Sequence, residues 1–268
     1  MIISDKHRFC FIHIPKCAGT SVRRSVEAFD DTKGAFTKRV EEHEVLGLLD
    51  YVHIPLSVLE RYFPLEYRKV RDYSSFAVVR DPFARFPSSL AQRIKMYKGR
   101  TLQELSKKEV RKELDEAISF LDKNRGASLL PPDFIHFQSQ KSYIYNDNER
   151  VVEHLYTVDR VSELLARIED VVDEKFLSRA QPSHQNKTIV YRSALARNVI
   201  MFLRPLLSAY IQRLLSERAR AAVRSYVYVP GGDKPDKILK SEYVRSFVGE
   251  YYSQDIALFH QVSEAGAL

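Results

Sequence analysis

The stretch Phe9-Cys-Phe-Ile-His-Ile-Pro-Lys-Cys-Ala-Gly-Thr-Ser-Val22 decides how this chain folds. Residues 9–14 are apolar or β-favouring without clean alternation, which predicts a strand buried on both faces. Pro15 ends that strand, Gly19 permits a tight turn, and a helix is predicted to run from there to about Phe29. A strand, a small-residue loop and a helix in this order favour an α/β fold.

The loop between this strand and this helix is predicted to bind an anion. Thr20 or Ser21 is expected to cap the helix, whose first backbone N–H groups have no partner inside the helix and point at the loop. Lys16 adds a mobile cation, and the two hydroxyls add hydrogen-bond donors. A loop of this composition holds a phosphate or a sulfate.

Several chemistries use such a loop, and the stretch by itself leaves them open. A nucleotide kinase or NTPase carries Gly-x-x-x-x-Gly-Lys-Ser/Thr and Mg²⁺, but here Lys16 precedes the glycine, and Asp81 would have to serve as the metal carboxylate. A cysteine phosphatase would use Cys17 and Arg23, which stand at Cys-x5-Arg spacing, although the Gly-rich interior of such loops is missing. Sulfuryl transfer from a nucleotide sulfate needs the loop and a lysine but no metal. A non-catalytic nucleotide-binding protein would also keep the loop.

A second strand and helix, within Ser75–Arg93, offer a second anion site. Phe76–Val79 has the pattern of a buried strand, and Pro82 lies near the first turn of the helix that follows. Arg80 stands at the carboxyl end of its strand, where open α/β sheets bind ligands. Ser88 lies about two turns along the helix, so Arg80 and Ser88 are predicted to converge on one anion, with the arginine binding through its bidentate fork.

Together the two stretches resemble the PAPS-dependent sulfotransferases, where PAPS is 3′-phosphoadenosine 5′-phosphosulfate. More narrowly, they resemble the carbohydrate group that includes the heparan sulfate 2-O-sulfotransferase-like enzymes. In that family Pro-Lys-x-(Ala/Gly)-(Gly/Ser)-(Thr/Ser) binds the 5′-phosphosulfate, and Val-Arg-(Asp/Asn)-Pro-x-x-Arg-x-x-Ser binds the 3′-phosphate. These motifs stand here at Pro15–Ser21 and Val79–Ser88. Tyr251–Phe259 is similar to a third family motif, Tyr-Tyr-x-x-Asp-x-x-Leu-Phe.

The resemblance implies a fold, a reaction and a set of site residues. The fold would be a single α/β domain over 1–268, a P-loop-NTPase-like three-layer αβα arrangement around a central parallel sheet, with a helical insertion near 193–225. The reaction would move the sulfuryl group of PAPS to a hydroxyl of a carbohydrate or glycan acceptor and release PAP, without a metal. The nucleotide would be held by Lys16, Cys17, Ala18, Gly19, Thr20, Ser21, Arg80 and Ser88.

The resemblance also implies the catalytic residues. Family members carry a histidine between the two nucleotide motifs, just before a short helix, and His53 stands in a similar place. It would act as general base on the acceptor hydroxyl, a role that suits an imidazole with an unperturbed pKa of about 6.5. Lys16 would offset the charge that develops on the bridging oxygen as the sulfuryl group leaves.

The segment around His53 has a less distinct pattern. Val40–Leu49 is predicted to be helical, which puts His43 on a polar helix. Tyr51–Ile54 is predicted to be a short strand, followed by a helix from a Ser57 cap to about Phe63. His13, inside the first strand, is expected to pack in the sheet.

Later segments complete the predicted secondary structure. A long charged helix is expected over Leu102–Asp122, because its apolar residues form one helical stripe. Glu153–Val158 is predicted to be a third core strand, with a helix after Asp159. A final helix is predicted from Ser241 to about Gln261, with an aromatic face packed on the sheet.

Five polar residues of lower rank are candidate contacts to nucleotide or acceptor. Gln138 and Gln140 follow the Pro-Pro break after the long helix. His184, Asn186 and Lys187 belong to a segment that resembles the family's His-x-Asn-Lys-Ser/Thr loop, although a plain polar loop fits them equally well. The histidines have no paired spacing with other ligand types, so no metal site is predicted.

Composition sets the expected partners and location. The net charge of +7 fits attraction of an anionic nucleotide and an acidic glycan, and without an aromatic-basic RNA motif no nucleic acid partner is expected. Cys10 and Cys17 give no disulfide framework, and no signal peptide or anchor is visible, so a cytoplasmic, bacterial enzyme is expected. Charged residues and Pro205 interrupt the apolar stretch 193–225, so it is not a membrane span. We interpret it as a packed helical hairpin in preference to a lid, a homo-oligomer surface or a membrane-surface contact.

Overall fold

A four-stranded sheet lies at the centre of the computed structural model, which describes residues 1–176, 190–191, 228–229 and 234–265. Its strands run in the order β1 (Ile2–Ser4), β2 (Phe9–Ile12), β5 (Ser74–Val79) and β8 (His154–Thr157). β1 pairs antiparallel with β2, and the other pairs are parallel. The predicted α/β class is therefore confirmed and the three predicted core strands all form, but the sheet, predicted to be parallel, is parallel only apart from β1.

The parallel register brings three strand ends to one edge of the sheet. Ile12 of β2 pairs with Ala77 of β5, and Val79 of β5 pairs with Thr157 of β8. Every residue of β2 is buried, as expected for a parallel strand covered on both faces. The residues that follow these strands therefore emerge side by side, at the edge where open α/β sheets bind ligands.

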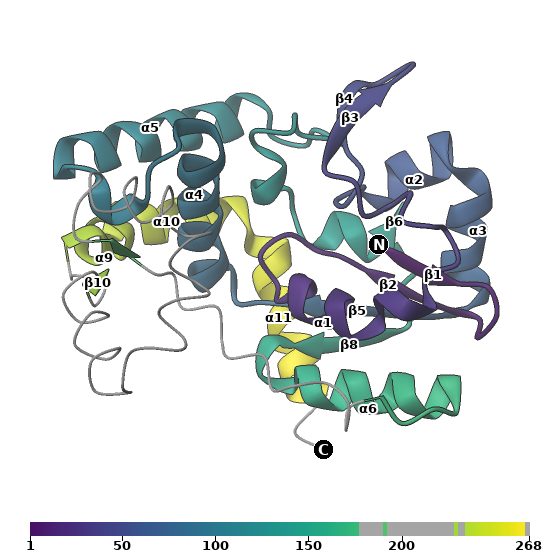
Figure 1. Ribbon diagram of the computed structural model, residues 1–268. Helices are drawn as coiled ribbons and strands as arrows, with labels where there is room; N and C mark the ends of the chain where they lie inside the picture. The colour runs from purple at the N-terminus through teal and green to yellow at the C-terminus, as the bar shows by residue number, and fades with distance from the viewer. Residues whose placement is uncertain (177–189, 192–227, 230–233, 266–268) are drawn as a thin grey trace, which may run out of the picture.

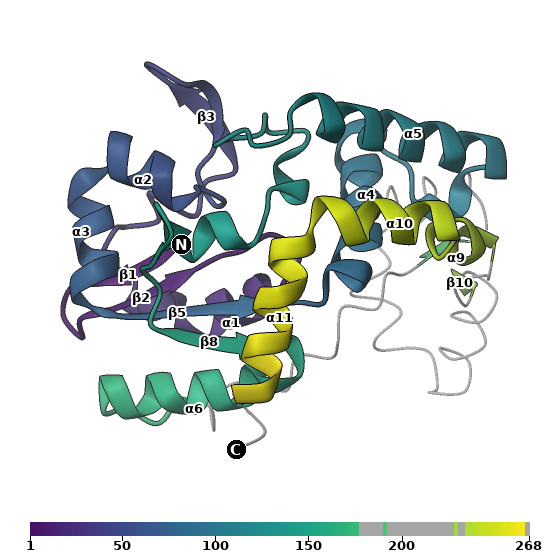
Figure 2. The ribbon, with the colours of Figure 1, turned by 180° about the vertical axis from the view of Figure 1, so that it is seen from behind.

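Helices cover the two faces of the sheet. α1 (Gly19–Val26) lies in front of it in Figure 1, and α11 (Ser253–Ala265) crosses in front of β8 in the opposite view of Figure 2. α3 (Pro64–Asp72) packs on β2 and β5, and α6 (Val161–Val172) packs along β8. Together these elements enclose the main hydrophobic core.

A second hydrophobic cluster lies beside the sheet, among helices that Figures 1 and 2 show grouped together. It is built from α4 (Pro82–Lys98), α5 (Lys107–Lys123), α9 (Lys234–Leu239) and α10 (Glu242–Tyr251). The predicted long charged helix is α5 with a preceding 3₁₀ turn, and a capping box starts each of them.

The remaining elements are short. They are α2 (Leu56–Tyr62), β3 (Val40–His43), β4 (Gly47–Asp50), β6 (Tyr145–Asn146), β7 (Glu149–Arg150), β9 (Val190–Tyr191), β10 (Tyr228–Val229) and 3₁₀ turns at Glu27–Phe29, Leu102–Glu104, Ile135–Phe137, Lys141–Tyr143 and Val158–Arg160. His184, Asn186, Lys187 and the insertion predicted near 193–225 lie outside the described residues. Among the helices that the structure describes, none has the length and apolar character needed to cross a bilayer.

The segment before the short α2 differs from its prediction. Val40–Leu49 is not a helix but the hairpin of β3 and β4, in which Val40 pairs with Asp50 and His43 with Gly47. Gly47 takes a positive φ of 67°, a conformation that glycine adopts readily. Pairing between the two strands thus overrides the local helical pattern of Val40–Leu49. Tyr51–Ile54, predicted as a strand, is the turn after this hairpin.

Predicted helix boundaries also change. α2 begins at Leu56 with Pro55 as its cap residue, so Ser57 is not the cap. The predicted final helix is two helices, α10 and α11, with Tyr252 at the junction. Tyr252 is buried, and its hydroxyl donates to the Phe137 carbonyl, which ties the bend to the core.

Candidate active site

A pocket of about 580 Å³ lies at the carboxyl edge of the sheet. It brings together eight of the predicted site residues, which come from four separate segments. These are Lys16, Ala18, Gly19, Thr20, Ser21, His53, Arg80 and Ser88. The pocket also contains residues that the sequence did not single out, including Arg39, Gln92 and His136.

The loop before α1 is held by backbone conformation and not by a side-chain cap. Lys16 and Ala18 both have positive φ, 64° and 59°, and Ala18 is the N-cap residue of α1. Neither Thr20 nor Ser21 caps the helix, because the helix already begins at Gly19. Both residues line the pocket at the first turn of α1, where the N–H groups of Gly19 and Thr20 precede the first intrahelical bonds, which run from Ser21 and Val22 to the Ala18 carbonyl.

Gly19 is required for a different reason from the predicted turn. A Cβ atom at this position would lie 2.0 Å from Cδ2 of His13. The helix therefore starts against the face of the His13 ring, which only a residue without a side chain permits. His13 is buried as predicted, but its ring also lines the pocket.

Cys17 is the predicted loop residue whose side chain turns away from the pocket. Its Sγ donates to Gln140 Oε1 at 3.1 Å, and burial raises the pKa of the thiol to about 12. Arg23 also lies outside the pocket lining and donates to the Thr37 carbonyl. A protonated, buried thiol is a poor nucleophile, so the cysteine phosphatase is not favoured.

Lys16 and Arg80 meet in one pocket. Arg80 Nη1 donates to the Lys16 carbonyl at 3.2 Å, and Lys16 Nζ donates to Gln92 Oε1 at 3.2 Å. The predicted anion sites are therefore continuous. Burial first, and then the positive charges of Arg80, Arg39 and Lys95, lower the pKa of Lys16 to about 8. A site that depresses the pKa of its own lysine in this way favours a strongly anionic ligand.

Histidine rings form one wall of the pocket. The centroids of His13 and His53 lie 4.7 Å apart, and those of His53 and His136 lie 5.5 Å apart. His53 Nδ1 lies 2.9 Å from the His13 carbonyl oxygen. Burial lowers the pKa of His53 well below 6.5, and the neighbouring histidines add to this shift, so the ring is neutral near pH 7.

A buried polar network fixes the end of β5 from behind the pocket. The side chain of Gln140 pairs with both backbone groups of Arg80, accepting from its N–H at 2.8 Å and donating to its carbonyl at 2.9 Å. The same Gln140 Oε1 accepts from the Cys17 thiol. Gln140, a predicted ligand contact, therefore positions Arg80 and the loop from inside the protein. Gln138 is also internal and bonds to backbone groups of Ala127 and Leu130.

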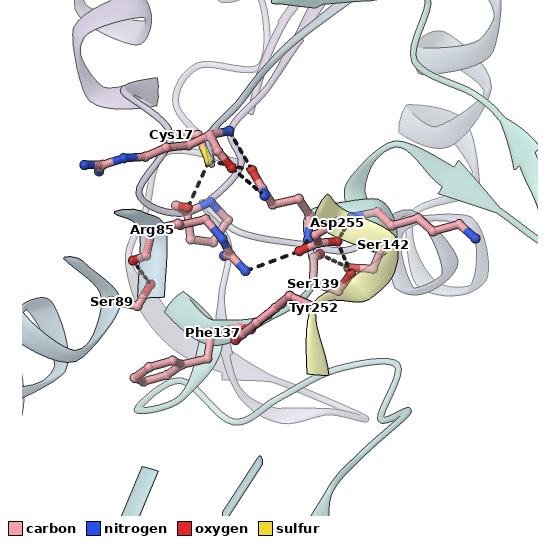
Figure 3. Close-up of polar contacts among 12 residues, drawn as sticks. Cys17, Arg85, Ser89, Phe137, Ser139, Ser142, Tyr252 and Asp255 are labelled. Carbon is pink, nitrogen blue, oxygen red and sulfur yellow. Dashed lines mark hydrogen bonds and ion pairs between the residues drawn. The ribbon is translucent and has the colours of Figure 1, made fainter. Parts of the chain in front are cut away.

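Asp255 anchors this network, as Figure 3 shows. Its carboxylate accepts from Ser139 Oγ at 2.6 Å and from the N–H groups of Gln140 at 2.8 Å and Lys141 at 3.0 Å. It also forms an ion pair of 3.5 Å with Arg85, whose side chain is buried. The terminal motif Tyr251–Phe259 and the Val79–Ser88 motif are thus joined in the core.

Removal of the Asp255 carboxylate is expected to destabilise the protein. Asp255→Ala leaves the Arg85 charge buried without its partner, which costs about 3–5 kcal/mol. The control is Glu250→Ala on α10, whose carboxylate pairs with Arg125 at the surface and which should change stability by less than about 1 kcal/mol. Urea unfolding followed by circular dichroism measures both. Equal stability of the two variants would show that the buried pair is not needed.

The kinase alternative needs Asp81 as its metal carboxylate, but Asp81 does not line the pocket. The Asp81 carboxylate caps α4 by accepting from the Phe83 N–H at 3.0 Å, in the role of a helix cap. Within the described ranges, no group of three or more histidine, cysteine and acidic side chains could hold a metal ion.

The sequence pointed more clearly to some of the missed pocket residues than to others. Gln92 stands four residues after Ser88 on α4, so helical spacing puts both on one face. His136 lies two residues before Gln138, inside a stretch already singled out. No sequence pattern identified Arg39, because it lies in a polar segment. It reaches the pocket through the position of the β3–β4 hairpin that it precedes.

Comparison with known proteins agrees with this arrangement. A family model described as the sulfotransferase family matches residues 1–260. Neither the curated proteins nor the solved structures include a significant match to this chain. The family match covers both motifs that meet in the pocket and the terminal motif that supports them, and the chain belongs to the sulfotransferase family.

Proposed function

We propose that this protein is a PAPS-dependent sulfotransferase that transfers the sulfuryl group to a hydroxyl of a carbohydrate or glycan. The observation that carries the proposal is a single cationic pocket in which Lys16, Arg80 and Ser88 lie together with the neutral His53. The likeness of the two motifs to the heparan sulfate 2-O-sulfotransferase-like group favours a carbohydrate acceptor.

The loop before α1 would bind the 5′-phosphosulfate in a P-loop-like manner. The first N–H groups of the eight-residue α1 and the hydroxyls of Thr20 and Ser21 supply donors, and Lys16 supplies charge. Arg80 and Ser88 would bind the 3′-phosphate. Since Gln140 holds both backbone groups of Arg80, the guanidinium starts from a fixed strand end.

The transfer would be in line. The bond between sulfur and the acceptor oxygen forms as the bond between sulfur and the bridging phosphate oxygen breaks. The acceptor proton passes to Nε2 of His53, and the electron pair of the broken bond stays on PAP. Lys16 offsets the charge on that oxygen. The negative charges of PAPS raise the pKa values of Lys16 and His53 above those of the empty pocket.

Ligand-induced thermal shifts test the nucleotide directly. PAP should raise the melting temperature more than AMP, because AMP lacks the 3′-phosphate that Arg80 and Ser88 would bind. ATP with Mg²⁺ should act no better than AMP. A larger increase in melting temperature with magnesium-ATP than with PAP would contradict the proposal and support the kinase alternative.

Cys17→Ser separates sulfuryl transfer from cysteine chemistry. The variant is expected to keep most of its activity, because the thiol faces Gln140 and the serine hydroxyl can donate to the same oxygen. PAP release from PAPS in the presence of acceptor measures this. Complete loss of turnover in a folded Cys17→Ser variant would point to a nucleophilic thiol.

Affinity for PAP is expected to depend on pH through Lys16. The ligand prefers the charged lysine, so affinity is full below the Lys16 pKa of about 8. Above it, affinity should fall by up to about tenfold per pH unit, until the raised pKa of the complex is reached. Lys16→Arg should flatten this profile between pH 7 and 9.5, because a guanidinium stays charged. Calorimetric titrations over this range provide the measurement, and a steep profile in Lys16→Arg would assign it to another group.

We also propose a cytoplasmic location. Both cysteines are free thiols, which suits a reducing compartment. Fractionation of cells that express the untagged protein tests this.

A further inference from the structure

The histidine wall of the pocket contains ring nitrogens without partners. His53 Nδ1 has the His13 carbonyl as partner, but the Nδ1 atoms of His13 and His136 are buried and have no hydrogen-bond partner in the part of the chain that the structure describes. His136 is only 2% exposed, and it lines the pocket beside His53. Among the described residues, the Nε2 atoms of these three rings are not buried without a partner, as the two Nδ1 atoms are. Nε2 is therefore the nitrogen through which each ring can contact a ligand in the pocket.

These contacts fix where each neutral ring carries its proton. A neutral imidazole has one N–H group and one lone pair. A carbonyl oxygen only accepts, so His53 carries its proton on Nδ1 and presents a lone pair at Nε2. This is the tautomer that a general base requires.

His136 has the opposite arrangement. A proton on its Nδ1 would be a buried N–H without an acceptor, which is costlier and rarer than an unpartnered acceptor. Its proton therefore lies on Nε2. Burial, with the charges of Lys16, Arg39 and Arg85, lowers the pKa of His136 to about 3, so the ring stays neutral and keeps a single N–H.

We propose that His136 is a second catalytic histidine, whose Nε2–H donates to a non-bridging oxygen of the sulfuryl group during transfer. This inference rests on the proposed function. The acceptor oxygen must lie at Nε2 of His53 and the leaving oxygen near Lys16, so the sulfur lies between them. The ring of His136, 5.5 Å from that of His53, flanks this position. His136 transfers no proton, and stabilises the charge on the sulfuryl oxygens.

His13 shares the orphaned Nδ1 but is a weaker candidate for this role. Its ring is packed against the backbone of Gly19, so it supports the start of α1. The position of His136 is fixed independently, because its carbonyl accepts from Arg85 Nη1 at 3.2 Å and from Ser89 Oγ at 2.7 Å. Backbone contacts survive substitution of the side chain, so variants at this position keep the local fold.

Two substitutions test the donor. His136→Leu removes it, and kcat is expected to fall about 10²- to 10³-fold, as for loss of one oxyanion donor. His136→Gln keeps an N–H near the Nε2 position and should recover most of that loss. Affinity for PAP, which has no sulfuryl group, should match that of the wild type in both. Equal kcat in His136→Leu and the wild type, or equal losses in the two variants, would overturn the proposal.

The tautomers can be read in the unmodified protein. Nitrogen-15 NMR of histidine-labelled protein should show His53 protonated on Nδ1 and His136 on Nε2, with assignments made from the His53→Gln and His136→Gln spectra. A proton on Nδ1 of His136 would end the proposal whatever kcat the variants show. Failure of the wild type to bind PAP would instead count against the proposed function, so the two failures are distinguishable.

Discussion

His53→Ala is expected to lower kcat about 10²- to 10⁴-fold, the effect of losing a general base. Affinity for PAP should remain near that of the wild type, because His53 is assigned to the acceptor hydroxyl and not to a phosphate. The measurement is release of PAP and transfer of ³⁵S from PAPS to a panel of unsulfated glycosaminoglycans and chitooligosaccharides. Titration calorimetry with PAP shows that the pocket is intact.

His260→Ala is the matched control for this substitution. His260 is exposed on α11 and does not line the pocket, so its loss should leave kcat unchanged. If His53→Ala turned over at the rate of the His260→Ala control, His53 would not be the general base. His13 and His136, the other rings of the wall, would then be the next groups to substitute.

Lys16→Ala is expected to lower kcat about 10²- to 10³-fold, because the charge on the leaving oxygen loses its stabilising cation. PAP affinity should weaken as well, since a charge-assisted hydrogen bond contributes about 1.5–3 kcal/mol. The fold should survive because, among the described residues, the Lys16 side chain donates a hydrogen bond only to Gln92. Melting temperature without ligand, calorimetry and the transfer assay measure the three effects.

Lys95→Ala separates local from general electrostatics. Lys95 is exposed on α4 and adds to the field at Lys16, but it does not line the pocket. Its removal should change PAP affinity little, and less as salt is added. If both lysine variants lose activity alike, Lys16 acts only through net charge.

Local patterns predicted the elements that carry the site. The apolar run before Pro15 and the Phe76–Val79 run are buried strands, because their composition reports burial on both faces. Pro82 opens a helix as predicted, and Asp81, which the sequence suggested only as a metal ligand, is the cap of that helix. The spacing of apolar residues wrongly predicted a helix at Val40–Leu49. This segment forms a hairpin through pairing between two strands, which the spacing of its residues does not indicate.

The sequence by itself determined the chemistry that is present: a lysine-bearing loop before a helix, and an arginine at the end of a parallel strand. Only the tertiary structure decided which side chains reach the pocket. The Cys17 thiol turns inward to Gln140, 123 residues away, while His136 joins His53 in the wall. Contacts across such separations depend on how whole elements pack, whereas composition and spacing report only the burial and conformation of neighbouring residues.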